Sequence, residues 1–135
     1  MAVSALAGPL SNFALAALLG VLVRAGVVDW HSPWQYSPFY YWNASWVAAD
    51  IIGYVILFNL ILGVFNLIPI PPLDGFNIAM GILPRRQAEA VARVQQYGPL
   101  LLLVLIFLSY FTDFLWDFLL RGVDLFARLF VGQPL

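Results

Sequence analysis

Asp74 is the residue of this sequence whose type and position most clearly suggest chemistry. It lies in the stretch FNLIPIPPLDG, residues 65–75, directly after an apolar run long enough to cross a membrane. A charged side chain at membrane depth is costly and by default suggests a function. The three prolines of this stretch prevent a continuous helix, so the helix is predicted to end near Ile68. Asp74 would then lie on irregular backbone, which survives at membrane depth only inside protein or beside a wet cavity.

Two asparagines precede Asp74 in the apolar run. Asn59 and Asn66 are seven residues apart, so they share one face of a helix that leads on to Asp74. Their amides would be unsatisfied in hydrocarbon and must face protein or water. A simpler interpretation of Asp74 is an ordinary turn, in which its side chain accepts from nearby amides and Gly75 supplies an unusual backbone conformation. The residues alone leave both interpretations open.

The composition indicates an integral membrane protein. The 135 residues are 63% hydrophobic and 10% charged, far from the average of soluble domains, and the mean hydropathy is +0.90. The net charge of −1 provides no basic surface, so no nucleic-acid partner is expected, and the absence of cysteine excludes disulfides and thiolate metal sites. We therefore predict an all-α, multi-pass protein that has the lipid bilayer as its partner.

Three membrane spans are predicted within a single membrane domain, residues 1–135. The spans are about 9–28, 46–68 and 98–116, because about 20 apolar residues cross the hydrocarbon core. Pro9 suits the first turn of the first helix, where its missing amide costs nothing. Only 15 apolar residues separate the start of the third span from its first charge, so this helix is predicted to continue through the charges that follow.

The segments that flank the second span indicate its orientation. Aromatic side chains crowd residues 29–46, which is typical of a membrane surface, and three arginines between residues 85 and 93 mark the cytoplasmic side. Asp74 is therefore predicted at the cytoplasmic end, followed by a solvated surface helix. His31, the only histidine, invites a metal assignment that we reject, because no other ligand stands nearby in sequence.

Charged residues near the C-terminus form one helical stripe. Acid and base alternate one turn apart in it, which predicts two ion pairs, Asp117 with Arg121 and Asp124 with Arg128. We expect an amphipathic end that leaves the membrane and lies along its surface.

Two motifs in order resemble the site-2 protease family of intramembrane zinc metalloproteases. They are AGPLSN at residues 7–12 and FNLIPIPPLDG at residues 65–75, and the resemblance covers about residues 1–80. It implies a partial site-2 protease core in a prokaryotic cell membrane, with the transmembrane helices of membrane-bound proteins as substrates. It also implies that Asp74 is the third protein ligand of a catalytic zinc. Asn66 would be a catalytic residue that holds the substrate or the oxyanion.

The sequence departs from that family in one respect. The family takes two histidines and a general-base glutamate from an upstream HExxH helix, but the only glutamate here is Glu89 and the only histidine is His31. We therefore expect a C-terminal part that needs an upstream HExxH segment as its partner and is inactive alone. One alternative is a non-catalytic scaffold or pseudoprotease that binds a partner helix. Another is a transporter-like protein with an ion site, although no internal repeat supports it.

Overall fold

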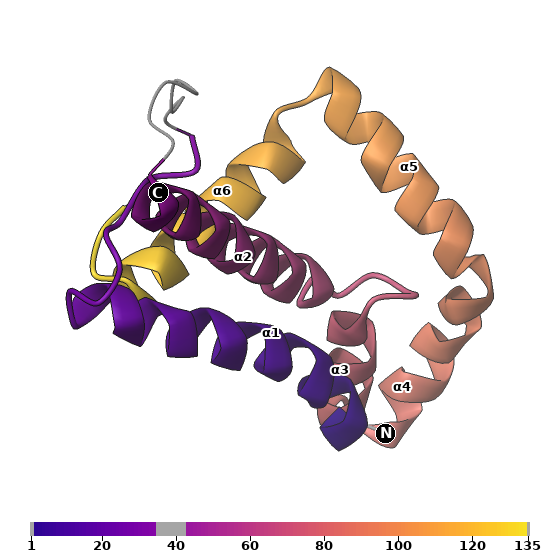
Figure 1. Cartoon of the computed structure of the whole chain (residues 1–135). Helices are drawn as coiled ribbons and strands as arrows, with labels where there is room; N and C mark the ends of the chain where they lie inside the picture. The colour runs from indigo at the N-terminus through magenta and orange to yellow at the C-terminus, as the bar shows by residue number, and fades with distance from the viewer. Residues whose placement is uncertain (1, 35–42, 135) are drawn as a thin grey trace.

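The computed structural model describes residues 2–34 and 43–134 as a set of helices (Figure 1). No strand occurs in these two ranges, which confirms the all-α prediction. The elements are α1 (Ala2–Arg24), α2 (Ala44–Asn66), α3 (Asp74–Ile82), α4 (Arg85–Ala92), the 3-10 helix η1 (Arg93–Tyr97), α5 (Gly98–Phe111) and α6 (Phe114–Phe130).

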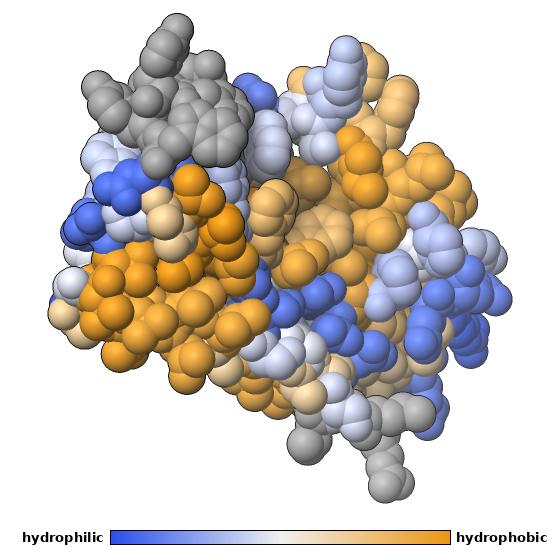
Figure 2. Space-filling model, viewed as in Figure 1, coloured by the Kyte–Doolittle hydropathy of each residue, from blue (hydrophilic) through white to orange (hydrophobic). Residues whose placement is uncertain are grey.

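Among the residues that the structure describes, three segments are long and apolar enough to cross a membrane, as predicted, and hydrophobic residues cover much of the face seen in Figure 2. They are Ser4–Arg24, Ala44–Asn66 and Arg86–Phe111. The third includes α4 and η1 as well as α5. With 14 residues, α5 alone measures about 21 Å, less than the roughly 30 Å of a hydrocarbon core.

The core lies where α1, α2 and α6 meet. In Figure 1, α1 and α2 lie side by side, while α5 extends away from them and α6 returns to cross α2. The ring of Phe13 in α1 stacks on Phe126 of α6 with centroids 4.3 Å apart, and it also fills the space that Gly63 of α2 leaves free. Small residues at such crossings allow close packing of membrane helices.

The helix α1 begins before Pro9, not at it as predicted. Pro9 is buried in the helix interior, one turn after Ala5, whose carbonyl it leaves without an amide partner. Membrane helices tolerate such a proline where neighbouring groups satisfy the freed backbone. The hydroxyl of Ser11 donates to the Gly8 carbonyl at 2.8 Å in this turn. The apolar residues that precede Pro9 therefore belong to the same helix.

The prediction that the third helix continues to residue 116 is wrong. The helix α5 ends at Phe111, and Thr112 adopts an extended backbone with φ −134° and ψ 135°. The hydroxyl of Thr112 donates to the Leu108 carbonyl at 3.0 Å, so a local side-chain bond accompanies this end. Asp113 then precedes a new helix, α6.

The helix α6 packs against α1 and α2 and is not one of the three candidate spans. That this amphipathic end lies along the membrane surface stays a prediction. The buried residues of α6 recur every four positions and form an apolar stripe that the charges do not interrupt: Leu115, Leu119, Val123 and Ala127. Both predicted ion pairs are confirmed, with Arg121 to Asp117 at 3.4 Å and Arg128 to Asp124 at 2.8 Å. The charged stripe thus lies beside the packed face of α6.

The end of α6 is attached to the end of α1. The Nη2 atom of Arg24 donates to the carbonyls of Arg128 at 3.2 Å and Leu129 at 2.8 Å. These carbonyls are among the last of α6 and lack partners within the helix. A cation at a helix C-terminus is favourable, so Arg24 acts as a cap supplied from another helix.

Candidate functional site

Asp74 is the first residue of α3 and follows the irregular segment that the prolines predict. The helix α2 ends at Asn66, two residues before the predicted end, and α3 begins after Leu73, whose backbone is extended. Between them the chain makes tight bends, with the Ile70 amide donating to the Ile68 carbonyl at 2.8 Å and the Leu73 amide donating to the Ile70 carbonyl at 2.9 Å. The broken helix thus places a carboxylate at the start of a new one.

Gly75 is required for close packing and not for an unusual backbone conformation. It lies in α3, and its φ is not positive. A Cβ atom added there would collide with the backbone of Leu67 and lie 2.5 Å from the Ile68 carbonyl oxygen. The turn interpretation of Asp74 and Gly75 therefore needs correction, because the glycine lets α3 press against the chain that leaves α2.

Gly8 of the first motif lies directly against Asp74 of the second. A Cβ atom added at Gly8 would collide with Oδ2 of Asp74 and lie 3.4 Å from its Cγ. The structure therefore brings together the two motifs that carried the family resemblance, and it does so at the carboxylate.

A third close approach fixes the other side of the proline segment. A Cβ atom added at Gly98, the first residue of α5, would lie 3.0 Å from both the Cβ and the carbonyl carbon of Pro71. The segment before Asp74 thus packs against the start of α5, and the start of α3 packs against the end of α2. The carboxylate of Asp74 lies against α1. Each of the three contacts depends on a glycine.

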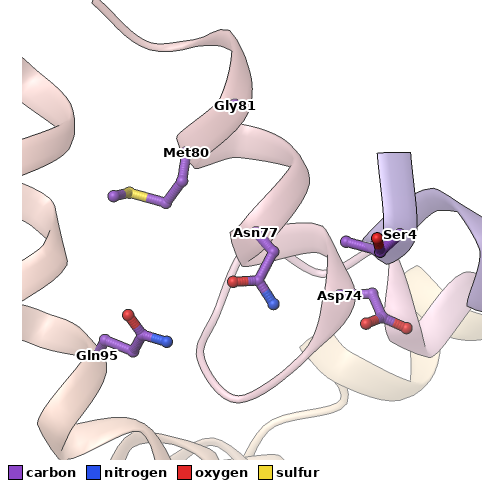
Figure 3. A pocket seen from close by; sticks show the side chains of 7 residues that line it. Ser4, Asp74, Asn77, Met80, Gly81 and Gln95 are labelled. Atoms are coloured by element: carbon purple, nitrogen blue, oxygen red, sulfur yellow. The ribbon is translucent and has the colours of Figure 1, made fainter. Parts of the chain in front are cut away.

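Asp74 faces a cavity of about 670 Å³ between α1, α3 and η1 (Figure 3). Sequence reasoning missed three other polar residues in its wall, Ser4, Asn77 and Gln95. Asn77 follows Asp74 by three positions in α3, and this spacing could have indicated it. No sequence signal links Gln95 to Asp74, since their proximity depends on how η1 folds back.

The carboxylate of Asp74 is half-buried and has no hydrogen bond or ion pair with any side chain that the structure describes, a set that does not include the side chain of Arg85. Its place in the first turn of α3 favours the negative charge through the helix dipole. Because no side chain of the described chain occupies its lone pairs, they are available to a cation or a substrate.

The described residues fit one ligand of a zinc site but not a complete site. Catalytic zinc takes three protein ligands and a water molecule. No group of three or more histidine, cysteine, aspartate or glutamate side chains that could hold a metal occurs within the described ranges. Asp74 has the chemistry of a zinc ligand, and any further ligands would have to come from outside these residues.

Asn66 does not line the cavity, although the start of α3 packs close by. It is the last residue of α2 and half-buried, and Gly75 contacts the backbone of the residue that follows it. The catalytic role of Asn66 stays a prediction.

His31 lies at the other end of α2 from Asp74. Its Nδ1 atom is 2.9 Å from Oδ1 of Asp50, and its ring contacts Trp46 with centroids 4.6 Å apart. This pair attaches the segment before α2 to its first turns. Most of the predicted aromatic cluster, residues 35–42, lies outside the described residues.

These observations define a helical integral membrane protein in which a broken helix presents a carboxylate to a cavity. The sequence model of peptidase family M50 matches residues 38–109, more than half of the chain. The chain therefore belongs to peptidase family M50, which confirms the predicted resemblance to the site-2 proteases.

Two curated relatives are named "Putative zinc metalloprotease". One is YwhC of Bacillus subtilis (strain 168), 37% identical over 79 residues, which are 57% of this chain and 36% of the relative. The other is Rip2 of Mycolicibacterium smegmatis, 31% identical over 137 residues, covering 95% of this chain and 46% of the relative. The chain thus spans less than half the length of either relative. No solved structure matches it.

Proposed function

We propose that this chain forms part of an intramembrane zinc metalloprotease and supplies one zinc ligand, Asp74. The observation that carries the proposal is the half-buried carboxylate of Asp74, which has no partner in the described chain and is held against Gly8 at the wall of a cavity. The names of the relatives support zinc, and membership of family M50 supports peptide hydrolysis.

The remaining ligands and the general base would come from an HExxH segment upstream of this sequence. The chain spans less than half of its relatives, which leaves ample length for that segment. Without two imidazoles, one carboxylate is a poor zinc site. On this proposal the 135 residues need the upstream segment for both metal binding and activity.

In the reaction, this chain would position one ligand and the substrate. The chemistry supplied by bound zinc is polarisation of the scissile carbonyl and activation of a water molecule. Asp74, whose backbone position is set by the packing of α3 against the end of α2, would contribute its carboxylate. Asn66 would donate its side-chain amide to the developing oxyanion or to the substrate backbone, a role that needs the substrate to reach the end of α2.

The proposed substrates are transmembrane helices of membrane-bound proteins. The candidate spans of the described residues are apolar, and the cavity is lined by the start of the first span and by Gln95 of the third, so a substrate helix in the same bilayer could reach it. Both curated relatives come from bacteria, which supports a prokaryotic cell membrane as the location.

Asp74→Asn in the protein that includes the upstream segment tests the proposal. The substitution keeps the size of the side chain and removes its charge. We expect normal membrane insertion, loss of stoichiometric zinc and loss of cleavage of a transmembrane substrate. Asp113→Asn, at an exposed position before α6, is the matched control and should keep both zinc and cleavage. Cleavage by Asp74→Asn at the parent rate would refute Asp74 as a ligand, and a parent without zinc or cleavage would favour the non-catalytic scaffold.

A further inference from the structure

Two side-chain amides face each other across the cavity that Asp74 lines. Asn77 belongs to α3 and Gln95 to η1, and Figure 3 shows their amide groups pointing toward one another, with Asp74 on the far side of Asn77. Asn77 is half-buried, whereas Gln95 is exposed. The function proposed above gives neither residue a role.

Neither amide is used to hold the fold together. With the backbone and the side chains that the structure describes, Arg85 not among the latter, the side chains of Asn77 and Gln95 make no hydrogen bond. Each primary amide has one acceptor oxygen and two donor hydrogens. The cavity therefore offers donors and acceptors on two opposite walls, next to the proposed zinc ligand.

A transmembrane substrate creates a need for such groups. In an α-helix the backbone amides and carbonyls form hydrogen bonds to one another. The side chains surround them and bring the helix diameter to about 10–12 Å, so the scissile carbonyl is shielded. The helix must unwind locally before that carbonyl can reach a catalytic site. The freed backbone groups then need new partners, because unpaired groups at membrane depth are costly.

We propose that Asn77 and Gln95 bind the unwound backbone of the substrate to one side of the scissile bond, with Asn77 nearer to Asp74. This inference rests on the proposed function. Primary amides match peptide groups as both donors and acceptors, and because they are neutral they add no charge to be desolvated beside Asp74. The cavity volume of about 670 Å³ lies in the usual range of ligand sites, roughly 300–1,000 Å³.

The position of Asn77 indicates which substrate groups it binds. Three residues along a helix correspond to a rise of about 4.5 Å, and an extended chain advances about 3.3 Å per residue. Asn77 therefore reaches a peptide group one or two residues from the one next to Asp74. Because these contacts involve only the substrate backbone, selection depends on how easily a segment unwinds and little on its side chains.

Binding of modified peptides to the protein that includes the upstream segment tests the inference. A labelled transmembrane peptide is titrated after metal removal, so that no cleavage occurs, and its peptide bonds near the expected scissile position are replaced one at a time by esters. An ester lacks the N–H donor. Asn77→Leu and Gln95→Met remove the amides at nearly constant size, and Gln87→Met, on α4 away from the cavity, is the matched control.

We expect each cavity variant to weaken binding of the all-amide peptide by about tenfold, the usual size of a lost buried hydrogen bond. In the parent and in Gln87→Met, one ester should weaken peptide binding by about tenfold. In the variant that lacks the side-chain amide that binds at this position, the same ester should change binding very little. A folding defect lowers binding of the all-amide peptide and of the ester peptide equally, so it does not change the ratio of their two dissociation constants.

Equal ester costs in the parent and in both cavity variants would overturn the inference, as would absence of binding to the parent. If the ester coupling is present but the zinc-loaded protein cleaves nothing, the proposed protease function fails while the backbone-binding site stands.

Discussion

Gly8 lies so close to the carboxylate of Asp74 that a Cβ atom at Gly8 would collide with Oδ2. The contact joins the first half of α1 to the first residue of α3, which are far apart in sequence. It gives a physical reason for glycine at this position, since any side chain would displace the carboxylate. The two sequence motifs of the family are therefore parts of one site.

Gly8→Ala is the direct test of that contact. The new methyl group must displace the end of the Asp74 side chain, which costs little in stability because that side chain is flexible and faces a cavity, but which moves the proposed ligand. We expect zinc affinity and cleavage to fall at least about tenfold in the protein with its upstream segment. Ala14→Val, at an exposed position of the same helix, should leave both unchanged. Parent-like zinc binding in Gly8→Ala would show that the carboxylate has room to move.

Arg24 offers a prediction about stability that is independent of the site. Arg24→Met removes the cap from the last carbonyls of α6, so we expect a loss of about 0.5–2 kcal/mol. Arg121→Met is the control, because the Arg121 side chain is 83% exposed and its ion pair with Asp117 should contribute at most about 0.5 kcal/mol. Unfolding midpoints in detergent measure both. Equal midpoints for the two variants would mean that the Arg24 contact contributes no more than a surface pair.

The predicted topology is testable because the sequence contains no cysteine. Ser45 lies in the first turn of the second candidate span, and Gln87 in α4 lies beyond the other end of that span; both residues are exposed. If the arginines of residues 85–93 mark the cytoplasmic side, single cysteines at these positions should react with an impermeant thiol reagent from opposite sides. Reaction of both from one side would contradict the topology.

The sequence predicts helix type and the break before Asp74 well, because both depend on local chemistry. Apolar length determines which segments can span, and three prolines within four residues prevent α2 from continuing. Local rules failed at Pro9 and Thr112. Apolar residues before Pro9 extend α1 through this proline. The helix α6 packs on α2 through a stripe of buried residues, and the sequence does not reveal which helix this stripe contacts.

The candidate site was predicted only where a motif carried it. Asp74 follows from its place after the prolines, and the resemblance added Asn66. Asn77 could have been found from its spacing to Asp74, since three residues along a helix share a face. Gln95 could not, because its place opposite Asn77 depends on the path of the chain through α4 and η1.

Asn66 and Asn59 provide a last pair of substitutions that separates catalysis from helix structure. The amide of Asn59 donates to the Val55 carbonyl one turn back in its own helix at 2.8 Å, whereas Asn66 has no hydrogen bond to the described chain. Asn66→Ala should keep zinc and lower the cleavage rate about a hundredfold or more, the usual cost of a lost oxyanion donor. Asn59→Ala should keep both zinc and rate. A full cleavage rate in Asn66→Ala would remove this residue from the catalytic set, and loss of zinc in the same variant would show that it supports the metal site.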